Sequence, residues 1–380
     1  MCVCNWLLLF LESRVSLSRA IVCSIFFLGS SVFSLSCYAQ SPLSWQQLKA
    51  LYSQPQSQWP AVETTDGKEA TPLGPLTLLK PKPDKAQVVL GRELFHDTLL
   101  SRDKTVSCSS CHESRLLFGD MRSQPIGIDL QRGRRNSPNI FGIDHWQSFF
   151  WDGRAETAEQ QALMPIEDPK EMDFSVEGAL QRINAEPKYR PMIKQAFETT
   201  TLNRKQLAKA IVAFERTITP KDTVFARFIA KVQHNPKAAV TMLSESQLKG
   251  LHLYRTKTKC MTCHNGPLLS DNRFHITGLH AFGRRLEDLG RYEHTKEPSD
   301  VGAFRTPSLV MVSHTEPWMH HGLFVSLPGI INFYNRGGAQ PKPRKGRKPD
   351  PLFPTTTSLL KPLKLSKQER EDLLAFVHIL

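Results

Sequence analysis

The chain has 380 residues, of which 22% are charged and 40% hydrophobic, and its formal net charge is +13. This length suits two domains of ordinary size, each able to bury its own core. The positive charge favours a partner with an acidic surface, but apart from a basic loop at 341–350 it is spread along the chain, which argues against nucleic-acid binding.

The first 39 residues have the pattern of an export signal. Arg14 and Arg19 precede an apolar run over 20–35, and the residues Cys37-Tyr38-Ala39 suit cleavage after Ala39. Because the apolar run is short and interrupted by serines, an uncleaved membrane anchor is the weaker alternative, and lipid attachment at Cys37 is weaker still. We therefore expect an exported, periplasmic protein.

Beyond the signal, the sequence predicts an extended segment at 40–84, an N-terminal domain at 85–235 and a C-terminal domain at 236–380. The extended segment is rich in Pro, Gln and Ser. Helices are expected to start after Asp84, after Ser244 and after Ser366, because each can cap a helix and the last two have Gln247 and Glu369 at the capping-box position. Alternating strand patterns are scarce, so the predicted fold class is mainly α with long loops.

Four of the eight cysteines form two Cys-x-x-Cys pairs, each followed directly by His. The sites are Cys108, Cys111 and His112, and Cys260, Cys263 and His264. Two thiols about one helical turn apart can each bond a haem vinyl group, while the adjacent His is held beneath the iron. Zinc sites also use paired Cys-x-x-Cys units, and a dithiol or disulfide needs no His, but neither alternative predicts a His after both pairs. The sequence therefore predicts two covalently bound c-type haems in two cytochrome c-like domains.

Further motifs lie in order around the two attachment sites. They are LGRELFHD at 90–97, RNSP at 135–138, FWDGR at 150–154, FRTPSL at 304–309 and NFYNRGG at 332–338. Together they resemble the bacterial di-haem cytochrome c peroxidases, the family that includes the MauG-type enzymes. The resemblance runs from about residue 85 to the C terminus.

The resemblance implies that the N-terminal haem is the peroxide-reacting one. Gln161 and Glu171 match a Gln and a Glu, ten residues apart, that lie over its open face in the family. A carboxylate there can move a proton from the near to the far peroxide oxygen, and an amide can orient the peroxide. Trp151 matches the Trp between the two haems, where an indole shortens electron transfer, and it also fits a core aromatic.

The resemblance also implies a calcium ion at the domain junction. Asn136 matches a residue that binds the ion through its side chain, and Thr315 and Pro317 match two that bind it through backbone carbonyls. Oxygen donors suit a hard cation. With no carboxylate among the three, the calcium site rests on the resemblance alone.

One departure from the family concerns the N-terminal haem. Many of the peroxidases carry a His sixteen residues after the first haem-binding His, which caps the resting haem, and here that position is Ile128. An aliphatic side chain cannot ligate iron, so this haem is expected to stay open. His96 and His145 are the remaining substitutes, although each is more typical of an ordinary surface or structural His.

A second departure concerns the distal ligand of the C-terminal haem, usually a Met in the peroxidases. Aligning His320-His321-Gly322 with the His-Asp-Gly of the family places Tyr334 at this position, as in MauG-type enzymes. A phenolate stabilises ferric iron, whereas a thioether does the opposite. The alternative is that Tyr334 packs in a helix and that another residue, such as Met311 or Met319, is the ligand.

Three functions follow from these observations. The first is a peroxidase that takes electrons from a small cytochrome c or cupredoxin at the C-terminal haem, the second a MauG-like oxidase of a protein or other substrate, and the third a plain electron carrier. Gln161 and Glu171 oppose the third, while Ile128 and Tyr334 shift weight to the second. The sequence thus predicts a peroxide-reacting di-haem enzyme; its oligomeric state, a homodimer included, stays open.

Overall fold

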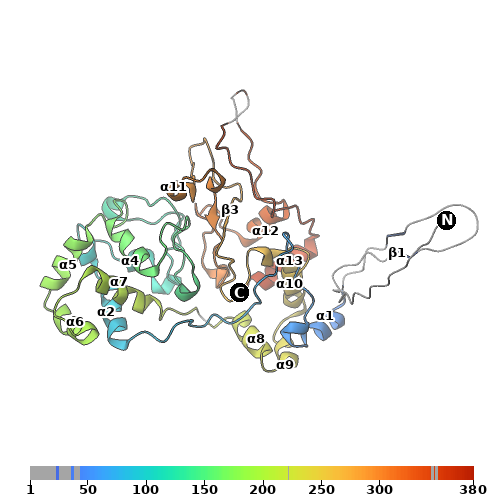
Figure 1. The fold of residues 1–380 in the computed structure, drawn as a ribbon. Helices are drawn as coiled ribbons and strands as arrows, with labels where there is room; N and C mark the ends of the chain where they lie inside the picture. The colour runs from blue at the N-terminus through green and yellow to red at the C-terminus, as the bar shows by residue number, and fades with distance from the viewer. Residues whose placement is uncertain (1–22, 25–35, 38–42, 221, 344–345, 347–349) are drawn as a thin grey trace, which may run out of the picture.

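The computed structural model describes residues 23–24, 36–37, 43–220, 222–343, 346 and 350–380, so the predicted export signal lies almost entirely outside the described residues. The fold is mainly helical, as predicted, with two lobes joined by long loops (Figure 1). Among the residues described, no helix is long and apolar enough to span a membrane.

The N-terminal lobe is built around two closely packed helices. Its helices are α2 (Lys85–His96), α3 (Cys108–Cys111), α4 (Ala158–Glu167), α5 (Val176–Ala185), α6 (Tyr189–Phe197) and α7 (Arg204–Glu215). The predicted start of α2 is confirmed, because the Asp84 side chain accepts hydrogen bonds from the N–H groups of Ala86 and Gln87. A Cβ at Gly91 would lie 1.8 Å from the Ala210 carbonyl oxygen, so only glycine permits this approach of α2 to α7.

The C-terminal lobe repeats this arrangement with another helix pair. Its elements are α8 (Val224–Val232), α9 (Pro236–Val240), α10 (Glu245–Arg255), α11 (Tyr292–Thr295), α12 (Leu327–Asn335), α13 (Lys367–Val377) and the antiparallel pair β3 (Phe274–His275) and β4 (Phe304–Arg305). The predicted capping boxes of Ser244 with Gln247 and of Ser366 with Glu369 are confirmed at the starts of α10 and α13. Gly250 allows the two helices to meet, since a Cβ there would lie 2.0 Å from the Asp372 carbonyl oxygen.

Short elements occupy the loops. They are β1 (Cys23–Ser24), β2 (Ser36–Cys37), and the 3₁₀ helices Gln56–Gln58, Thr98–Leu100, Ser114–Leu116, Ile128–Leu130, Ile143–His145, Cys260–Thr262, Pro298–Asp300 and Val312–His314.

The segment at 40–84 is not extended throughout, which corrects the sequence-based expectation. It contains α1 (Trp45–Tyr52), which starts at a capping box between Ser44 and Gln47 and buries Leu48 and Tyr52. This helix packs on α9 and α10, and the chain then crosses to the N-terminal lobe (Figure 1). The Pro- and Gln-rich composition obscured a short helix whose stability comes from this packing.

The domain division at residues 235 and 236 stays a prediction. Helix α8 precedes it in the chain, yet the Phe225 ring lies 5.7 Å from that of Phe376, and the Phe228 ring lies 6.0 Å from that of Trp59. Both distances join ring centroids, and they show that α8 packs on α13 of the C-terminal lobe and on Trp59 of the segment at 40–84.

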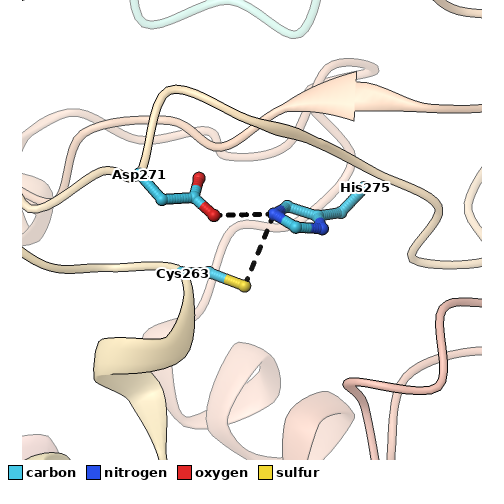
Figure 2. Close-up of side chains that lie close together, drawn as sticks. All are labelled: Cys263, Asp271 and His275. Atoms are coloured by element: carbon cyan, nitrogen blue, oxygen red, sulfur yellow. Dashed lines mark hydrogen bonds and ion pairs between the residues drawn. The ribbon is translucent and has the colours of Figure 1, made fainter. Parts of the chain in front are cut away.

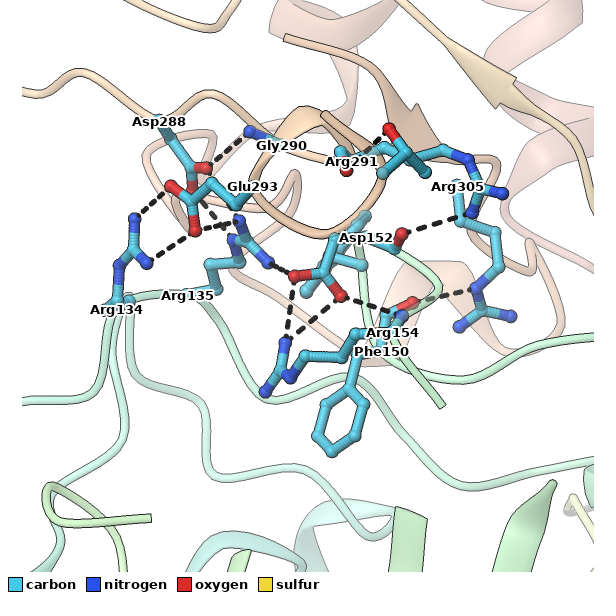
Figure 3. A network of polar contacts seen from close by, with 12 residues as sticks. Arg134, Arg135, Phe150, Asp152, Arg154, Asp288, Gly290, Arg291, Glu293 and Arg305 are labelled. Atoms are coloured by element: carbon cyan, nitrogen blue, oxygen red, sulfur yellow. Dashed lines mark hydrogen bonds and ion pairs between the residues drawn. The ribbon is translucent and has the colours of Figure 1, made fainter. Parts of the chain in front are cut away.

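A buried ion network joins the two lobes (Figure 3). The Arg135 guanidinium donates to Asp152 at 2.6 Å and, through two nitrogens, to Asp288 at 2.8 and 2.7 Å. Arg154 also donates to Asp152, at 3.1 Å. The side chains of Arg135 and Asp288 are only 8% and 10% exposed. Because both charges are desolvated, each needs its partner.

We predict that Asp288→Ala lowers the free energy of unfolding by about 3–5 kcal/mol, because it leaves the Arg135 guanidinium buried without one of its anions. Burial opposes ionisation of Asp288, but Arg135 outweighs it and lowers the pKa of this carboxyl. The loss is therefore expected at neutral pH and should shrink only as the pH falls through the lowered pKa. Urea unfolding followed by circular dichroism measures it.

The matched control is Asp222→Ala, which removes the same charge from an exposed pair with Arg227. An exposed pair contributes less than about 1 kcal/mol. Equal losses in the two variants would contradict a structural role for the buried network.

Candidate active site

The two predicted axial histidines are held alike. His112 and His264 each place Nδ1 near a backbone carbonyl oxygen, that of Phe118 at 2.9 Å and that of Leu269 at 3.0 Å. A hydrogen bond of this kind fixes the ring and leaves Nε2 as the nitrogen for the metal. Burial lowers the pKa of both rings, which favours the neutral form that a metal requires.

The four thiols of the two motifs are free in the structure. Burial is the main cause of their raised pKa values, which reach about 12 for Cys111 and about 11 for Cys260. Within the described part of the chain neither Cys-x-x-Cys pair forms a disulfide, so both thiols of each pair are available for thioether bonds to haem.

Cys263 of the second motif lies close to Asp271 and His275, and the three side chains could together bind a metal ion (Figure 2). The His275 Nε2 atom lies 2.8 Å from the Asp271 Oδ2 atom and 3.7 Å from the Cys263 sulfur. This group has one cysteine only, unlike a zinc site built from paired Cys-x-x-Cys units. The Cys263 sulfur belongs to the haem attachment motif, and His275 lines the cavity beside it. We therefore assign His275 to the wall of the predicted haem site, with Asp271 as its hydrogen-bond partner.

A cavity opens beside each motif. The larger, of about 650 Å³, is lined by residues that include Cys260, Cys263, His264 and Tyr334. The smaller, of about 300 Å³, is lined by residues that include Cys111, His112, Gln161 and Glu171. A cavity that presents both a thiol and an axial His, with apolar side chains around them, fits a covalently attached haem.

Glu171 and Gln161 meet at the smaller cavity. Gln161 lies on α4, which Thr157 caps, and Glu171 lies on the loop that follows this helix. The Asp168 carbonyl oxygen shapes the loop by accepting from three N–H groups, including that of Glu171 at 3.1 Å. Burial, then the nearby Asp168 carboxylate, raises the pKa of Glu171 to about 7. A carboxyl group with this pKa can take up and release a proton near neutral pH.

The loop that contains Ile128 supports the Glu171 loop. Ile128 is fully buried, and its N–H donates to the Glu171 carbonyl oxygen at 2.9 Å. Gly127 allows this approach, because a Cβ there would lie 2.0 Å from the Lys170 carbonyl oxygen. Ile128 is not among the described residues that line the smaller cavity. This agrees with the expectation that Ile128 does not occupy the distal position of the haem iron.

The two histidines considered as substitutes lie elsewhere. The His96 Nδ1 atom is 2.8 Å from the Arg92 carbonyl oxygen, and the His145 Nε2 atom is 2.6 Å from that of Thr77. Neither is among the described residues that line either of these two cavities.

A common wall separates the two cavities. Seven residues line both of them: Asn136, Ser137, Pro138, Asn139, Trp146, Trp151 and Arg305. Trp151 is 9% exposed, and its indole N–H donates to the Asn136 carbonyl oxygen at 2.8 Å. The structure thus places Trp151 between the predicted haem sites.

Tyr334, on α12, lines the larger cavity together with His264. Burial raises the pKa of its phenol, so only a strong electrophile such as ferric iron would favour the phenolate. Met319 also lines this cavity, whereas Met311 is 3% exposed, packs in the hydrophobic core and is absent from the described lining. Of the two methionines considered from the sequence, only Met319 is among the described residues that line this cavity.

The three predicted calcium ligands all line the larger cavity. The Asn136 amide nitrogen donates to the Arg122 carbonyl oxygen at 2.8 Å, and the Asn136 N–H donates to the His320 carbonyl oxygen at 2.8 Å. These bonds use nitrogen atoms and leave the Asn136 side-chain oxygen for a cation. Thr315 and Pro317 flank Glu316, which is joined to Pro317 by a cis peptide bond.

The cavities are also lined by Glu215 and Arg305, to which the sequence assigned no role. Glu215, on α7, lines the smaller cavity, and its Oε2 atom is buried without a hydrogen-bond partner. Burial, then the Glu159 carboxylate, raises the pKa of Glu215 to about 8. Arg305 lies in the shared wall. The FRTPSL motif contained Arg305, but no pattern marked Glu215.

Comparisons with known proteins agree with this architecture. A family model of di-haem cytochrome c peroxidases matches residues 85–234. The chain is 32% identical over 344 residues to the cytochrome-c peroxidase IdrP1 of Pseudomonas sp. (strain SCT), covering 81% of this chain and 84% of that protein. It is 30% identical over 337 residues to the methylamine utilization protein MauG of Methylorubrum extorquens, covering 88% and 84%.

A solved structure has the same fold. The crystal structure of a MauG-like protein associated with microbial copper homeostasis matches with a TM-score of 0.68 at 28% identity, covering 83% of this chain and 94% of that one. Its fold, the two relatives and the two Cys-x-x-Cys-His cavities agree, and the chain belongs to the di-haem cytochrome c peroxidase and MauG family, whose members are oxidoreductases with two c-type haems.

Proposed function

We propose that this protein reduces hydrogen peroxide at the smaller, N-terminal cavity with electrons from a small redox protein. The observation that carries the proposal is Glu171, a buried carboxyl group with a pKa raised to about 7, in the same cavity as His112 and Gln161. None of the hydrogen bonds of the described residues ends on the Glu171 carboxyl or on the Gln161 amide, so both are free to bind a substrate.

Glu171 and Gln161 have different roles in the reaction with peroxide. A haem held in this cavity by Cys111 and His112 would supply the iron and the electrons for cleavage of the O–O bond. The Glu171 carboxylate accepts the proton of one peroxide oxygen and returns it to the other, which then leaves as water. The remaining oxygen is released as a second water when two protons and the two electrons of the donor protein have been supplied. The Gln161 amide donates a hydrogen bond that orients the peroxide.

Electrons reach this cavity from the C-terminal lobe. In the proposal a small electron-donor protein, a cytochrome c or a cupredoxin, reduces the C-terminal haem. Trp151 contacts both cavities and shortens the gap between the two haems. The net positive charge of the chain favours a donor with an acidic surface.

A MauG-like oxidase is the second candidate function, and Tyr334 is the observation that favours it. A tyrosinate ligand stabilises ferric iron and higher oxidation states, which suits the withdrawal of electrons from a protein or other substrate. The relatives named above include both peroxidases and MauG proteins. Turnover of peroxide with reduced cytochrome c distinguishes the two functions, because a dedicated oxidase would not sustain it.

Export to the periplasm and a bound calcium ion complete the proposal. Export is supported by the composition of residues 1–39, and the mass of the mature chain tests cleavage after Ala39. Calcium is supported by the oxygen donors of Asn136, Thr315 and Pro317 at the larger cavity, and metal analysis of the isolated protein tests it.

We predict that Glu171→Gln slows the reaction with peroxide by roughly 100- to 10,000-fold, the contribution of a well-placed acid–base group. The amide keeps the size of the side chain but cannot carry the proton. Stopped-flow spectroscopy of the haem-loaded protein measures the rate. Glu177→Gln, at an exposed residue paired with Arg204, is the control and should keep the wild-type rate. An unaffected rate in Glu171→Gln would remove this residue from the mechanism.

The kcat/KM for peroxide should rise as the pH increases through about 7, because only the carboxylate form of Glu171 accepts the proton and its pKa is raised to about 7. A profile between about pH 5 and 9 measures this dependence. This rise of kcat/KM with pH should be absent in Glu171→Gln. If the variant keeps the rise, another group is the base.

Replacement of the proposed C-terminal ligand should change the spectrum of one haem only. We predict that Tyr334→Phe alters the ferric absorption and EPR signals of the C-terminal haem, since phenylalanine cannot ligate iron. Met319→Leu should leave them unchanged. The opposite pattern would show that Met319 is the ligand.

A further inference from the structure

Arg305 has an unusual environment in the wall between the two cavities. It ends strand β4, is 8% exposed and lines both cavities. Its Nε atom donates to the Phe150 carbonyl oxygen at 3.1 Å, and its backbone N–H donates to that of Trp151 at 2.8 Å. The guanidinium carbon lies 3.5 Å from the centroid of the Trp146 ring. These contacts fix the position of the side chain but supply no negative charge.

The terminal nitrogen Nη1 of Arg305 is buried without a hydrogen-bond partner. Figure 3 shows that no contact of the network reaches the two terminal nitrogens of this side chain. The nearby Arg135 guanidinium, which is equally buried, is paired with both Asp152 and Asp288. Asp152 is thus already engaged by Arg135 and by Arg154. Among the described residues, Arg305 forms no ion pair.

A buried cation without an anion is unfavourable, and burial lowers the pKa of Arg305 to about 9. The group is still positively charged at neutral pH. A guanidinium with free, buried N–H donors beside a cavity is built to bind a carboxylate or a similar planar anion. The anionic groups that enter these cavities with the family's cofactor are the propionate carboxylates of haem.

We propose that Arg305 binds a propionate of the haem in the larger, C-terminal cavity. The chain from Arg305 to Leu309 lines that cavity without interruption, whereas Arg305 alone of this segment reaches the smaller one. The backbone around Arg305 therefore lies along the cavity that is predicted to hold the C-terminal haem. The proposal rests on the two haems of the family and not on the reaction with peroxide, so either can fail without the other.

The consequence is a contribution to the reduction potential of the C-terminal haem. A cation held near a haem disfavours the ferric state, which carries one more positive charge than the ferrous state. Removal of the guanidinium also leaves the propionate charge uncompensated, which acts in the same direction. Loss of Arg305 should therefore lower this potential.

The test compares Arg305→Gln and Arg305→Lys with wild type in the haem-loaded protein. The midpoint potential of each haem is measured by spectroelectrochemical titration, with each haem assigned by its EPR signal. Arg284→Gln removes the same charge from an exposed residue and is the control. In Arg305→Gln we expect about a tenfold increase in the ferric-to-ferrous ratio of the C-terminal haem at fixed potential, equivalent to about 59 mV for one electron.

Further results complete the expected pattern. Arg305→Lys should retain most of the potential, because the charge remains, but should shift the propionate bending band in resonance Raman spectra, because the two-pronged contact is lost. The Raman band also provides the test if Arg305→Gln does not fold. Arg284→Gln should leave both potentials and the band unchanged.

Three outcomes would overturn the assignment. They are an unchanged C-terminal potential and an unchanged band, a shift that is as large or larger at the N-terminal haem, and a wild-type potential that follows the chloride concentration. The second would place the carboxylate on the other haem, and the third would show that a mobile anion, not a fixed propionate, occupies the site.

Discussion

The ion pairs of the Arg135 guanidinium set the geometry on which both cavities depend. Arg135 comes directly before Asn136, and its partner Asp152 comes directly after Trp151. The other partner, Asp288, belongs to the C-terminal lobe. The Arg135 guanidinium therefore connects the two segments that form the shared wall, and it also connects them to the C-terminal lobe. Since Arg135 is buried and charged, these partners cannot separate without a large desolvation cost, and Trp151 keeps its place between the haem sites.

The sequence predicted most of the helical scaffold because its signals are local. A capping side chain at Asp84, Ser244 or Ser366 needs only the next three residues to act, and all three helices start where expected. The attachment motifs are local as well. The helix at 45–52 was missed because its neighbouring composition is typical of loops and its stability depends on packing against α9 and α10.

The site itself could be predicted only in part. Gln161, Glu171 and Trp151 were found through motif context, and the structure places all three at the smaller cavity, with Trp151 lining both. Glu215 and Arg305 owe their importance to burial without a partner, which depends on which segments pack around them. No window of sequence reports that property. Met311 shows the same limit, because spacing alone could not distinguish a core methionine from the cavity-lining Met319.

The loop around Ile128 shows how a substitution at one position changes what a segment can do. In many of the peroxidases that the chain resembles, this position carries a His that caps the haem and is released on reduction. Here Ile128 is fully buried, its N–H bonds the Glu171 carbonyl oxygen, and Gly127 packs against the backbone of Lys170. Arg102 also connects the two loops, because it pairs with Asp129 in the Ile128 loop and with Asp173 beyond Glu171. A loop that moved to deliver or withdraw a ligand would break these bonds and expose an aliphatic side chain to water. The physical cost favours a fixed loop, so the segment that closes the haem in many relatives is better suited here to hold the Glu171 loop in place.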